Sequence, residues 1–134
     1  MSSANVKTRH LRHYSPAGLM VLRGPGERYT EGSRWTLADG RGFAEVELMR
    51  GSESIKPSTL YIENLEVKPE ERGEGHGRDL FLLVQRFAYN VGAKWIQIDS
   101  ERDAVGFWLR MGFEETGASF YGGKVSMIKR VTDT

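Results

Sequence analysis

The spacing of hydrophobic residues changes several times along this chain, and each spacing predicts a different element. Apolar and polar residues alternate on both sides of Asp39-Gly40, over residues 34–37 and 43–48, which predicts a β-hairpin. A short apolar run at 19–22 is consistent with a first strand. In the second arm of the hairpin, Ala44, Val46 and Leu48 would face one way, and Phe43, Glu45 and Glu47 the other.

The next apolar stretch, residues 59–68, changes register in its middle. Its apolar residues fall on even numbers up to Ile62 and on odd numbers from Leu65 onward. Because strand side chains alternate with period two, the core face must slip by one residue near Glu63. A β-bulge produces such a slip, and bulges are frequent beside active sites. The alternative is a loop up to residue 64, followed by a short strand.

A helical spacing follows at 80–91, where apolar residues recur three or four positions apart. The run stops at Gly92, and glycine commonly ends helices. A strand is predicted at 95–99, so the order strand, helix, strand predicts a parallel βαβ unit. A short helix capped by Asp103 and a final hairpin within 113–131 complete the chain. The predicted fold class is mixed α/β (α+β) with a central sheet.

A glycine-rich loop joins the strand at 59–68 to the helix, with the sequence Val67-Lys-Pro-Glu-Glu-Arg72-Gly-Glu-Gly75-His-Gly77. The first N–H groups of a helix lack internal partners, and the helix dipole favours negative charge there. Glycine lets a ligand approach the backbone closely. Neither a P-loop nor the Gly-x-Gly-x-x-Gly fingerprint is present. The loop predicts a diphosphate cradle; the alternative is an ordinary glycine-rich turn.

Two motifs carry a family resemblance. Arg72-x-x-Gly75-x-Gly77 after a hydrophobic strand closely resembles the acetyl-CoA signature of the GNAT superfamily of N-acetyltransferases. Residues 104–113, Ala-Val-Gly-Phe-Trp-Leu-Arg-Met-Gly-Phe, resemble that family's later helix ending in Gly-Phe. The resemblance extends over residues 34–131. It implies a central mixed sheet with flanking helices, acetyl-CoA as the cosubstrate, and transfer of its acetyl group to an amine.

The resemblance also implies which residues contact the coenzyme. The backbone around Leu65 and Val67 would hold the pantetheine arm, with the Val67 N–H facing the acetyl oxygen. Trp108 would either pack against that arm or belong to the core. The pyrophosphate would lie on seven consecutive residues of the loop: Arg72, Gly73, Glu74, Gly75, His76, Gly77 and Arg78.

Catalysis needs a base for the ammonium form of the substrate and an acid for the leaving thiolate. Glu63, at the expected bulge, is the first candidate for the base and Glu66 the second; the alternative for each is a solvated strand residue. Trp108 stands where family members often have a tyrosine that protonates the thiolate. An indole N–H does not release its proton near neutral pH. Tyr121, Tyr61 or solvent would then supply the proton.

The chain departs from the family pattern in two further places. Glu101 replaces an asparagine that often contacts pantetheine. Family members usually begin with a strand and two helices, whereas residues 1–32 lack helical periodicity. We therefore expect a shortened, irregular, basic N-terminal segment at 1–32 and an acetyl-CoA-binding domain at 33–134. An open acceptor site would suit a protein lysine or N-terminus, and a small amine remains an alternative.

Composition and charge further narrow the kind of protein that this chain can be. The length of 134 residues fits one domain, and the absence of cysteine excludes disulfides, thiolate metal sites and cysteine nucleophiles. No metal site is predicted. The net charge of +1 argues against a nucleic-acid partner, although a basic start around Arg9 could be an arm or a poorly ordered terminus. No long apolar run occurs, so we expect a cytoplasmic protein with no membrane partner.

Three functions remain open at this stage. The first is an active N-acetyltransferase, either as a monomer or as a homodimer. The second is a degenerate member of the family that binds acyl-CoA or a partner without significant catalysis. The third is a binding module that uses the basic start, with a purely structural glycine loop. Coenzyme binding separates the third from the others, and turnover separates the first from the second.

Overall fold

A computed structural model describes residues 13–14, 19–26, 28–51, 55, 58–68, 73–119 and 121–132. These residues form one eight-stranded sheet in the order β1-β2-β3-β4-β5-β6-β8-β7. Along the chain the strands are β1 (His13–Tyr14), β2 (Met20–Arg23), β3 (Arg34–Ala38), β4 (Gly42–Met49), β5 (Thr59–Val67), β6 (Trp95–Ser100), β7 (Glu114–Ser119) and β8 (Val125–Arg130). The helices are α2 (His76–Asn90) and α3 (Val105–Arg110), with short 3₁₀ turns η2 (Arg102–Ala104) and η3 (Tyr121–Gly123).

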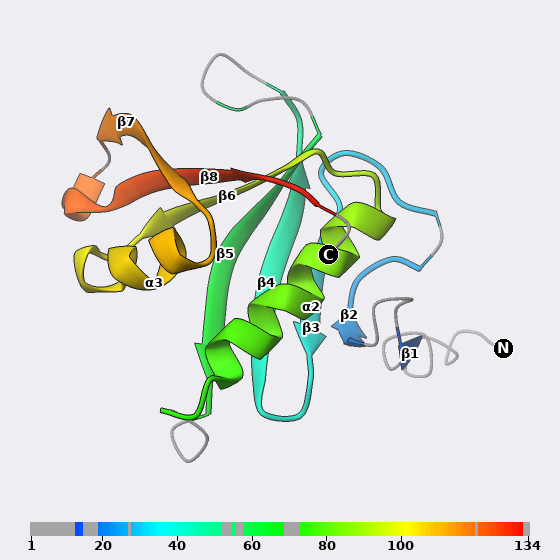
Figure 1. The fold of residues 1–134 in the computed structure, drawn as a ribbon. Helices are drawn as coiled ribbons and strands as arrows, with labels where there is room; N and C mark the ends of the chain where they lie inside the picture. Colours follow the sequence, from blue (N-terminus) through cyan, green and yellow to red (C-terminus); the bar gives the residue numbers. More distant parts are fainter. Residues whose placement is uncertain are drawn as a thin grey trace, which may run out of the picture.

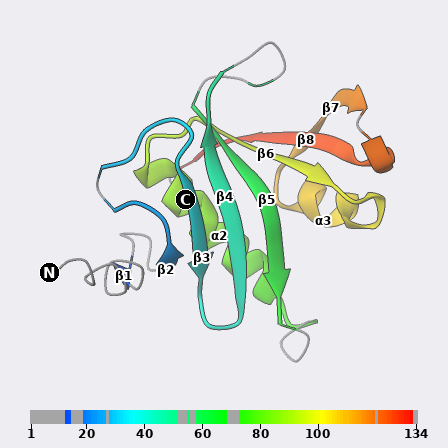
Figure 2. The same cartoon turned by 180° about the vertical axis from the view of Figure 1, so that it is seen from behind.

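The sheet is mixed, as predicted. Its one parallel pair among the described strands is β5 with β6, and every other neighbouring pair is antiparallel. Helix α2 connects β5 to β6 and crosses one face of the sheet (Figures 1 and 2). The βαβ unit that the sequence pattern predicted is therefore confirmed. Seen from behind in Figure 2, β3, β4 and β5 lie in front of α2.

The core lies between the sheet and α2. The alternation in β4 puts Ala44, Val46 and Leu48 on one face, as the pattern predicted, and the structure buries that face. The buried side of α2 carries Leu80, Phe81, Val84, Phe87 and Ala88. Apolar side chains from both elements thus leave water together, which is the main favourable term in folding. Strand β2 adds Leu19, just before it, and Val21 to the same core.

Two boundaries differ from the sequence expectation. Helix α2 begins at His76, before the periodic apolar run starts at Leu80, so Gly77 belongs to its first turn. The short helix is not capped by Asp103, because that residue lies inside η2. Residue 101 precedes η2 with extended backbone angles and no side-chain cap. The first turn of a helix often lacks apolar residues, so it does not show the helical spacing. Periodicity alone therefore places the start of the helix too late.

The expected bulge in β5 is confirmed. Glu45 of β4 pairs with Asn64 and Val46 pairs with Ile62, so Glu63 is the extra residue on β5. The parallel ladder between β5 and β6 also stops here, at the pair of Ile62 with Ile98. Beyond this point β5 follows β4, and β6 follows β8 to Ser100. The two parallel strands therefore part at the bulge.

The N-terminal side adds β2, which pairs with β3 through Val21 and Leu37. Most of the basic start, including Arg9, lies outside the described residues. Within the described part of the chain, neither helix has the length and hydropathy that a bilayer span requires.

Candidate active site

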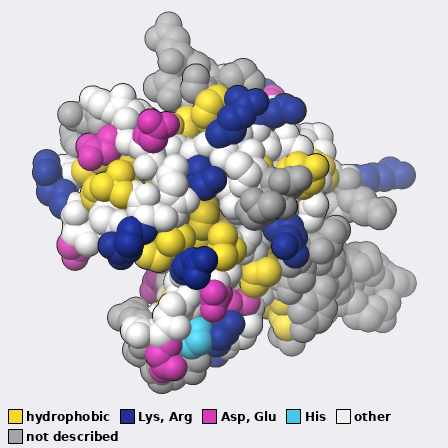
Figure 3. Space-filling model, viewed as in Figure 1, with side chains coloured by type: hydrophobic (Ala, Val, Ile, Leu, Met, Phe, Trp, Pro, Cys, Tyr) yellow, Lys and Arg dark blue, Asp and Glu magenta, His cyan; other side chains and the backbone are white. Residues whose placement is uncertain are grey.

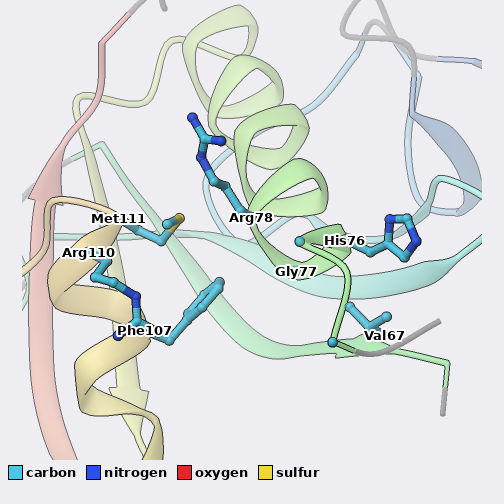
Figure 4. Close-up of a pocket in the computed structure, with 9 residues that line it drawn as sticks. Val67, His76, Gly77, Arg78, Phe107, Arg110 and Met111 are labelled. Carbon is cyan, nitrogen blue, oxygen red and sulfur yellow. The ribbon is translucent and has the colours of Figure 1, made fainter.

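Two cavities lie along β5, one beyond the point where β5 parts from β6 and the other beside the half that pairs with β6. The first, which we call the glycine-loop cavity, has a volume of about 620 Å³. It lies between the N-terminus of α2, the end of β5 and helix α3 (Figure 4). Its lining consists of Val67, Gly73, Gly75, His76, Gly77, Arg78, Phe107, Arg110 and Met111.

The backbone of the glycine loop turns sharply into α2. Gly75 precedes the helix with φ 81° and ψ 7°, a left-handed conformation that glycine adopts without strain. The first helical hydrogen bond runs from the Asp79 N–H to the Gly75 carbonyl, at 3.1 Å. The N–H groups of Gly77 and Arg78 precede that bond, so they have no helical acceptor. Together with the helix dipole, they favour an anion in the glycine-loop cavity.

The side chains of this cavity combine positive charge with an apolar wall. Among its described lining residues, the charged side chains are Arg78 and Arg110, and no carboxylate joins them. Phe107 points from α3 toward the first turn of α2, opposite Val67 (Figure 4). A Cβ at Gly77 would lie 3.4 Å from the ring of Phe107, an ordinary van der Waals distance, so the ring lies close to the first turn of α2. The cavity suits a molecule with both anionic and apolar parts.

A further arginine reaches the edge of the cavity from the hairpin between β3 and β4. Arg41 Nη1 lies 2.7 Å from His76 Nδ1. An arginine can only donate, so Nδ1 accepts and the ring proton of a neutral His76 is on Nε2. Figure 3 shows arginine and lysine side chains around exposed apolar surface on this side of the molecule.

The second cavity, which we call the acidic cavity, has a volume of about 320 Å³. Outward-facing positions of β3, β4, β5 and β6 supply most of it, so it lies on the sheet face opposite α2. This face of the sheet is turned toward the viewer in Figure 2. It is lined by Arg34, Glu47, Met49, Ile55, Tyr61, Glu63, Gln97 and Asp99.

Two polar contacts organise the acidic cavity. Arg34 donates from Nε to Glu47 at 2.9 Å and from Nη2 to Glu63 at 3.3 Å. The hydrogen bond to Glu47, followed by the charge of Glu63, raises the pKa of Arg34. Tyr61 donates its hydroxyl proton to Asp99 Oδ2 at 2.5 Å. Burial, followed by this hydrogen bond, raises the pKa of Tyr61, so the phenol stays neutral at physiological pH.

The site thus consists of a bulged strand, β5, which parts from its parallel neighbour β6. The N-terminus of α2 lies beyond the bulge and favours an anion. A family model described as "Acetyltransferase (GNAT) domain" matches residues 40–130, which is more than half of the chain. The chain belongs to the GNAT acetyltransferase family. The expectation drawn from the glycine loop and the later helix is thereby confirmed at the level of the family. No curated protein matches the chain.

Solved structures agree with this assignment. The crystal structure of nourseothricin acetyltransferase matches with a TM-score of 0.58 and 27% identity, over 75% of this chain and 65% of that one. The GNAT-family YhbS of Escherichia coli, in complex with CoA, matches with a TM-score of 0.59 and 16% identity, over 75% and 59%. The PaiA N-acetyltransferase of Thermoplasma acidophilum, in complex with coenzyme A, gives 0.56 and 17%, over 72% and 59%. This GNAT chain therefore spans slightly less than two thirds of the nourseothricin acetyltransferase chain.

The structure of this GNAT protein brings most of the predicted coenzyme residues together. Five of them line the glycine-loop cavity along with Val67: Gly73, Gly75, His76, Gly77 and Arg78. That lining includes neither Glu74, which is exposed, nor Leu65, which packs against the core. Arg72 lies outside the described residues. Trp108 is 5% exposed and packs against aromatic rings of the core, whereas its neighbour Phe107 lines the cavity.

The candidates for the base are separated in space. Glu63 lines the acidic cavity with 36% of its side chain exposed. Glu66 is exposed, lies outside that lining and accepts a hydrogen bond from Asn64 Nδ2 at 2.7 Å. The side chain of Tyr121 lies outside the described residues.

Several residues of both cavities were not predicted. Glu47 and Asp99 belong to the acidic cavity, and Arg110 and Met111 belong to the glycine-loop cavity. Period-two alternation does place Glu47 and Asp99 on the side away from the core. That signal does not say that strands β4 and β6 bring the two carboxylates to the same cavity.

Proposed function

We propose that this GNAT protein is an acetyl-CoA-dependent N-acetyltransferase that transfers an acetyl group to an amine by direct attack on the thioester. One observation carries the proposal. Two cavities of opposite charge flank the same strand, with Glu63 lining the acidic one and Val67 lining the glycine-loop one. The parting of β5 from β6 after Ile62 allows a substrate on each side to approach the same segment of backbone.

The coenzyme is assigned to the glycine-loop cavity. Its pyrophosphate would accept hydrogen bonds from the N-terminus of α2, and the guanidinium of Arg78 would add a charge-assisted contact. Its pantetheine arm would run past Phe107 along β5, between Leu65 and Val67. The backbone beside Val67 would then contact the acetyl oxygen and stabilise the oxyanion. Similarity to two GNAT structures solved with coenzyme A supports this assignment.

The reaction needs two proton movements besides the transfer. The acceptor ammonium first loses a proton, and its nitrogen attacks the thioester carbonyl, forming the N–C bond. The tetrahedral intermediate collapses as the C–S bond breaks, and the coenzyme leaves as a thiolate. The nitrogen loses a second proton, so one of the two protons neutralises the thiolate and the other reaches solvent. The products are an amide, CoA with a free thiol, and one proton.

We assign the first proton transfer to Glu63 rather than Glu66. Glu63 lines a cavity that an acceptor can enter, whereas Glu66 lies outside it. Arg34 forms an ion pair with Glu63 and is 66% exposed, so a substrate ammonium can displace it into water. Tyr121 or solvent protonates the thiolate in this proposal.

Calorimetric titration with acetyl-CoA tests the coenzyme site. Gly75→Glu places a carboxylate beside the phosphates and adds backbone strain, because φ is positive there. Gly75→Ala adds the same strain without charge, and its Cβ meets no other atom within 4 Å. We expect saturable binding in the wild type, weaker binding in Gly75→Ala and loss of binding in Gly75→Glu. Absence of binding in the folded wild type would overturn the proposed function.

Paired substitutions test the base. Glu63→Gln should lower kcat by about two to four orders of magnitude, the usual range for general base catalysis. Glu66→Gln removes the same charge from the same strand and should leave kcat close to that of the wild type. The kcat of each variant is measured by release of the CoA thiol and compared with that of the wild type. If Glu66→Gln shows the larger loss, the roles of the two glutamates are reversed.

One observation favours a second candidate, a family member that binds acyl-CoA without significant catalysis. Trp108 takes the place of a tyrosine acid, and its ring is buried among Phe81, Phe107 and Phe113. Binding of acetyl-CoA without thiol release, across a panel of amines, would favour this candidate over the transferase.

A further inference from the structure

We propose that the acidic cavity binds a small acceptor that carries a second positive charge besides the amine that is acetylated. The inference rests on the proposed function, because it names the acceptor class of the same reaction. In this arrangement Glu63 faces the reacting amine. The pair formed by Tyr61 and Asp99 holds the second ammonium, with Glu47 adding negative charge nearby.

The charge balance of the cavity is the first argument. Its described lining contains three carboxylates, Glu47, Glu63 and Asp99, against one guanidinium, Arg34, which leaves a formal charge of −2. Arg34 contacts Glu47 and Glu63. Asp99 has no cationic partner within the described part of the chain. Unpaired charge away from water is costly, so a cationic ligand is favoured over a neutral or anionic one.

The hydrogen bonding of Tyr61 is the second argument. Its single hydroxyl proton is donated to Asp99 Oδ2, so the phenolic oxygen can only accept a hydrogen bond from a ligand. The other carboxylate oxygen, Asp99 Oδ1, is buried and accepts no hydrogen bond from any described residue. The buried Asp99 Oδ1 therefore lacks a donor among the described residues, and the phenolic oxygen can accept one. An ammonium group provides three N–H donors and the matching charge.

The size and composition of the cavity select an organic cation of small size. Among the described residues, no group of three His, Asp or Glu side chains is arranged to hold a metal ion. The volume of about 320 Å³ lies near the lower end for small-molecule sites. Met49 and Ile55 supply apolar contacts for a methylene chain between two amines. A short linear diamine combines these features.

Matched amines test the proposal. Cadaverine and n-pentylamine have the same carbon chain, but only cadaverine has a second amine. We expect kcat/KM for cadaverine, measured by thiol release, to exceed that for n-pentylamine by about tenfold to a hundredfold, the range for hydrogen bonds to charged groups. Equal values for the two amines would overturn the proposal.

Three variants connect the preference to the cavity. Asp99→Asn and Glu47→Gln should each reduce the preference for cadaverine while changing kcat/KM for n-pentylamine much less. Glu45→Gln is the control, because Glu45 is exposed on the same strand as Glu47 and does not line the cavity. Acetyl-CoA affinity and thermal unfolding of each variant show whether it still folds. A cadaverine preference that survives in folded Asp99→Asn and Glu47→Gln would also overturn the proposal.

Calorimetric titration with cadaverine separates failure of this inference from failure of the proposed function. If acetyl-CoA binds but cadaverine neither binds nor reacts, only the acceptor class is wrong. If acetyl-CoA does not bind, the proposed function is wrong, and cadaverine binding then tests the cavity alone. Binding that is lost in Asp99→Asn would support a cation site there, whereas absence of binding would exclude one.

Discussion

The adjacent residues Phe107 and Trp108 on α3 give a sharp test of how the site is built. We expect Trp108→Leu to lower stability without changing coenzyme affinity, because the indole belongs to the core. Its ring makes edge-to-face contacts with Phe81, Phe107 and Phe113 at centroid distances of 5.8, 4.9 and 5.1 Å. The neighbouring Phe107 lines the glycine-loop cavity, so Phe107→Leu should mainly weaken acetyl-CoA binding.

The magnitude follows from the packing of Trp108. Truncating a buried tryptophan to alanine costs about 3–5 kcal/mol, and leucine keeps part of the lost volume. Each of the three aromatic pairs contributes about 0.5–1.5 kcal/mol beyond buried area. We therefore expect a loss of about 3 kcal/mol in the free energy of unfolding. A domain with a stability of about 5–15 kcal/mol still folds after this loss.

Urea unfolding followed by circular dichroism measures the stability of both variants. With a slope of about 2 kcal/mol per molar urea, a loss of 3 kcal/mol lowers the midpoint by about 1.5 M. Phe107 is only partly buried, so its replacement should lower stability less. We expect that change to weaken acetyl-CoA binding by about 1 kcal/mol, or about fivefold, through lost apolar contact.

The opposite pattern would refute this reasoning. If Trp108→Leu weakened acetyl-CoA binding as much as Phe107→Leu and left the urea midpoint unchanged, the indole would be a coenzyme contact. The resemblance to the family had left both roles open for Trp108.

Three further predictions follow from single contacts. Tyr61 has a raised pKa in the folded state. Unfolding should therefore be favoured by about 1.4 kcal/mol per pH unit as pH rises above about 10, and Tyr61→Phe should reduce this slope in urea titrations. A Cβ at Gly42 would clash with the Glu66 carbonyl oxygen, so Gly42→Ala should lower the free energy of unfolding by about 1–3 kcal/mol. Gly26→Ala is the control, because a Cβ there has open space. Arg41→Gln should weaken acetyl-CoA binding in calorimetry, and more at low than at high ionic strength, because salt screens its charge. A salt-independent loss would contradict the electrostatic role of Arg41.

The sequence by itself determined the elements that carry the site. The change from even to odd apolar positions between Ile62 and Leu65 predicted a bulge, and the structure places it at Glu63. The 3.6-residue period located α2, and the glycines before it marked the loop. These features could be predicted because each depends on neighbours within a few residues along the chain.

Only the tertiary structure decided what the side chains meet. The sequence predicted that Phe107 and Trp108 lie on one short helix, but packing against Phe81 and Phe113 buries the indole, while the Phe107 ring faces the cavity. Local patterns also do not predict that the carboxylates of the acidic cavity meet, because these carboxylates come from β4, β5 and β6. Local alternation fixes the face on which a residue lies. The neighbour on that face depends on strand order and on the parting of β5 from β6, and these are set by contacts between residues far apart in the sequence.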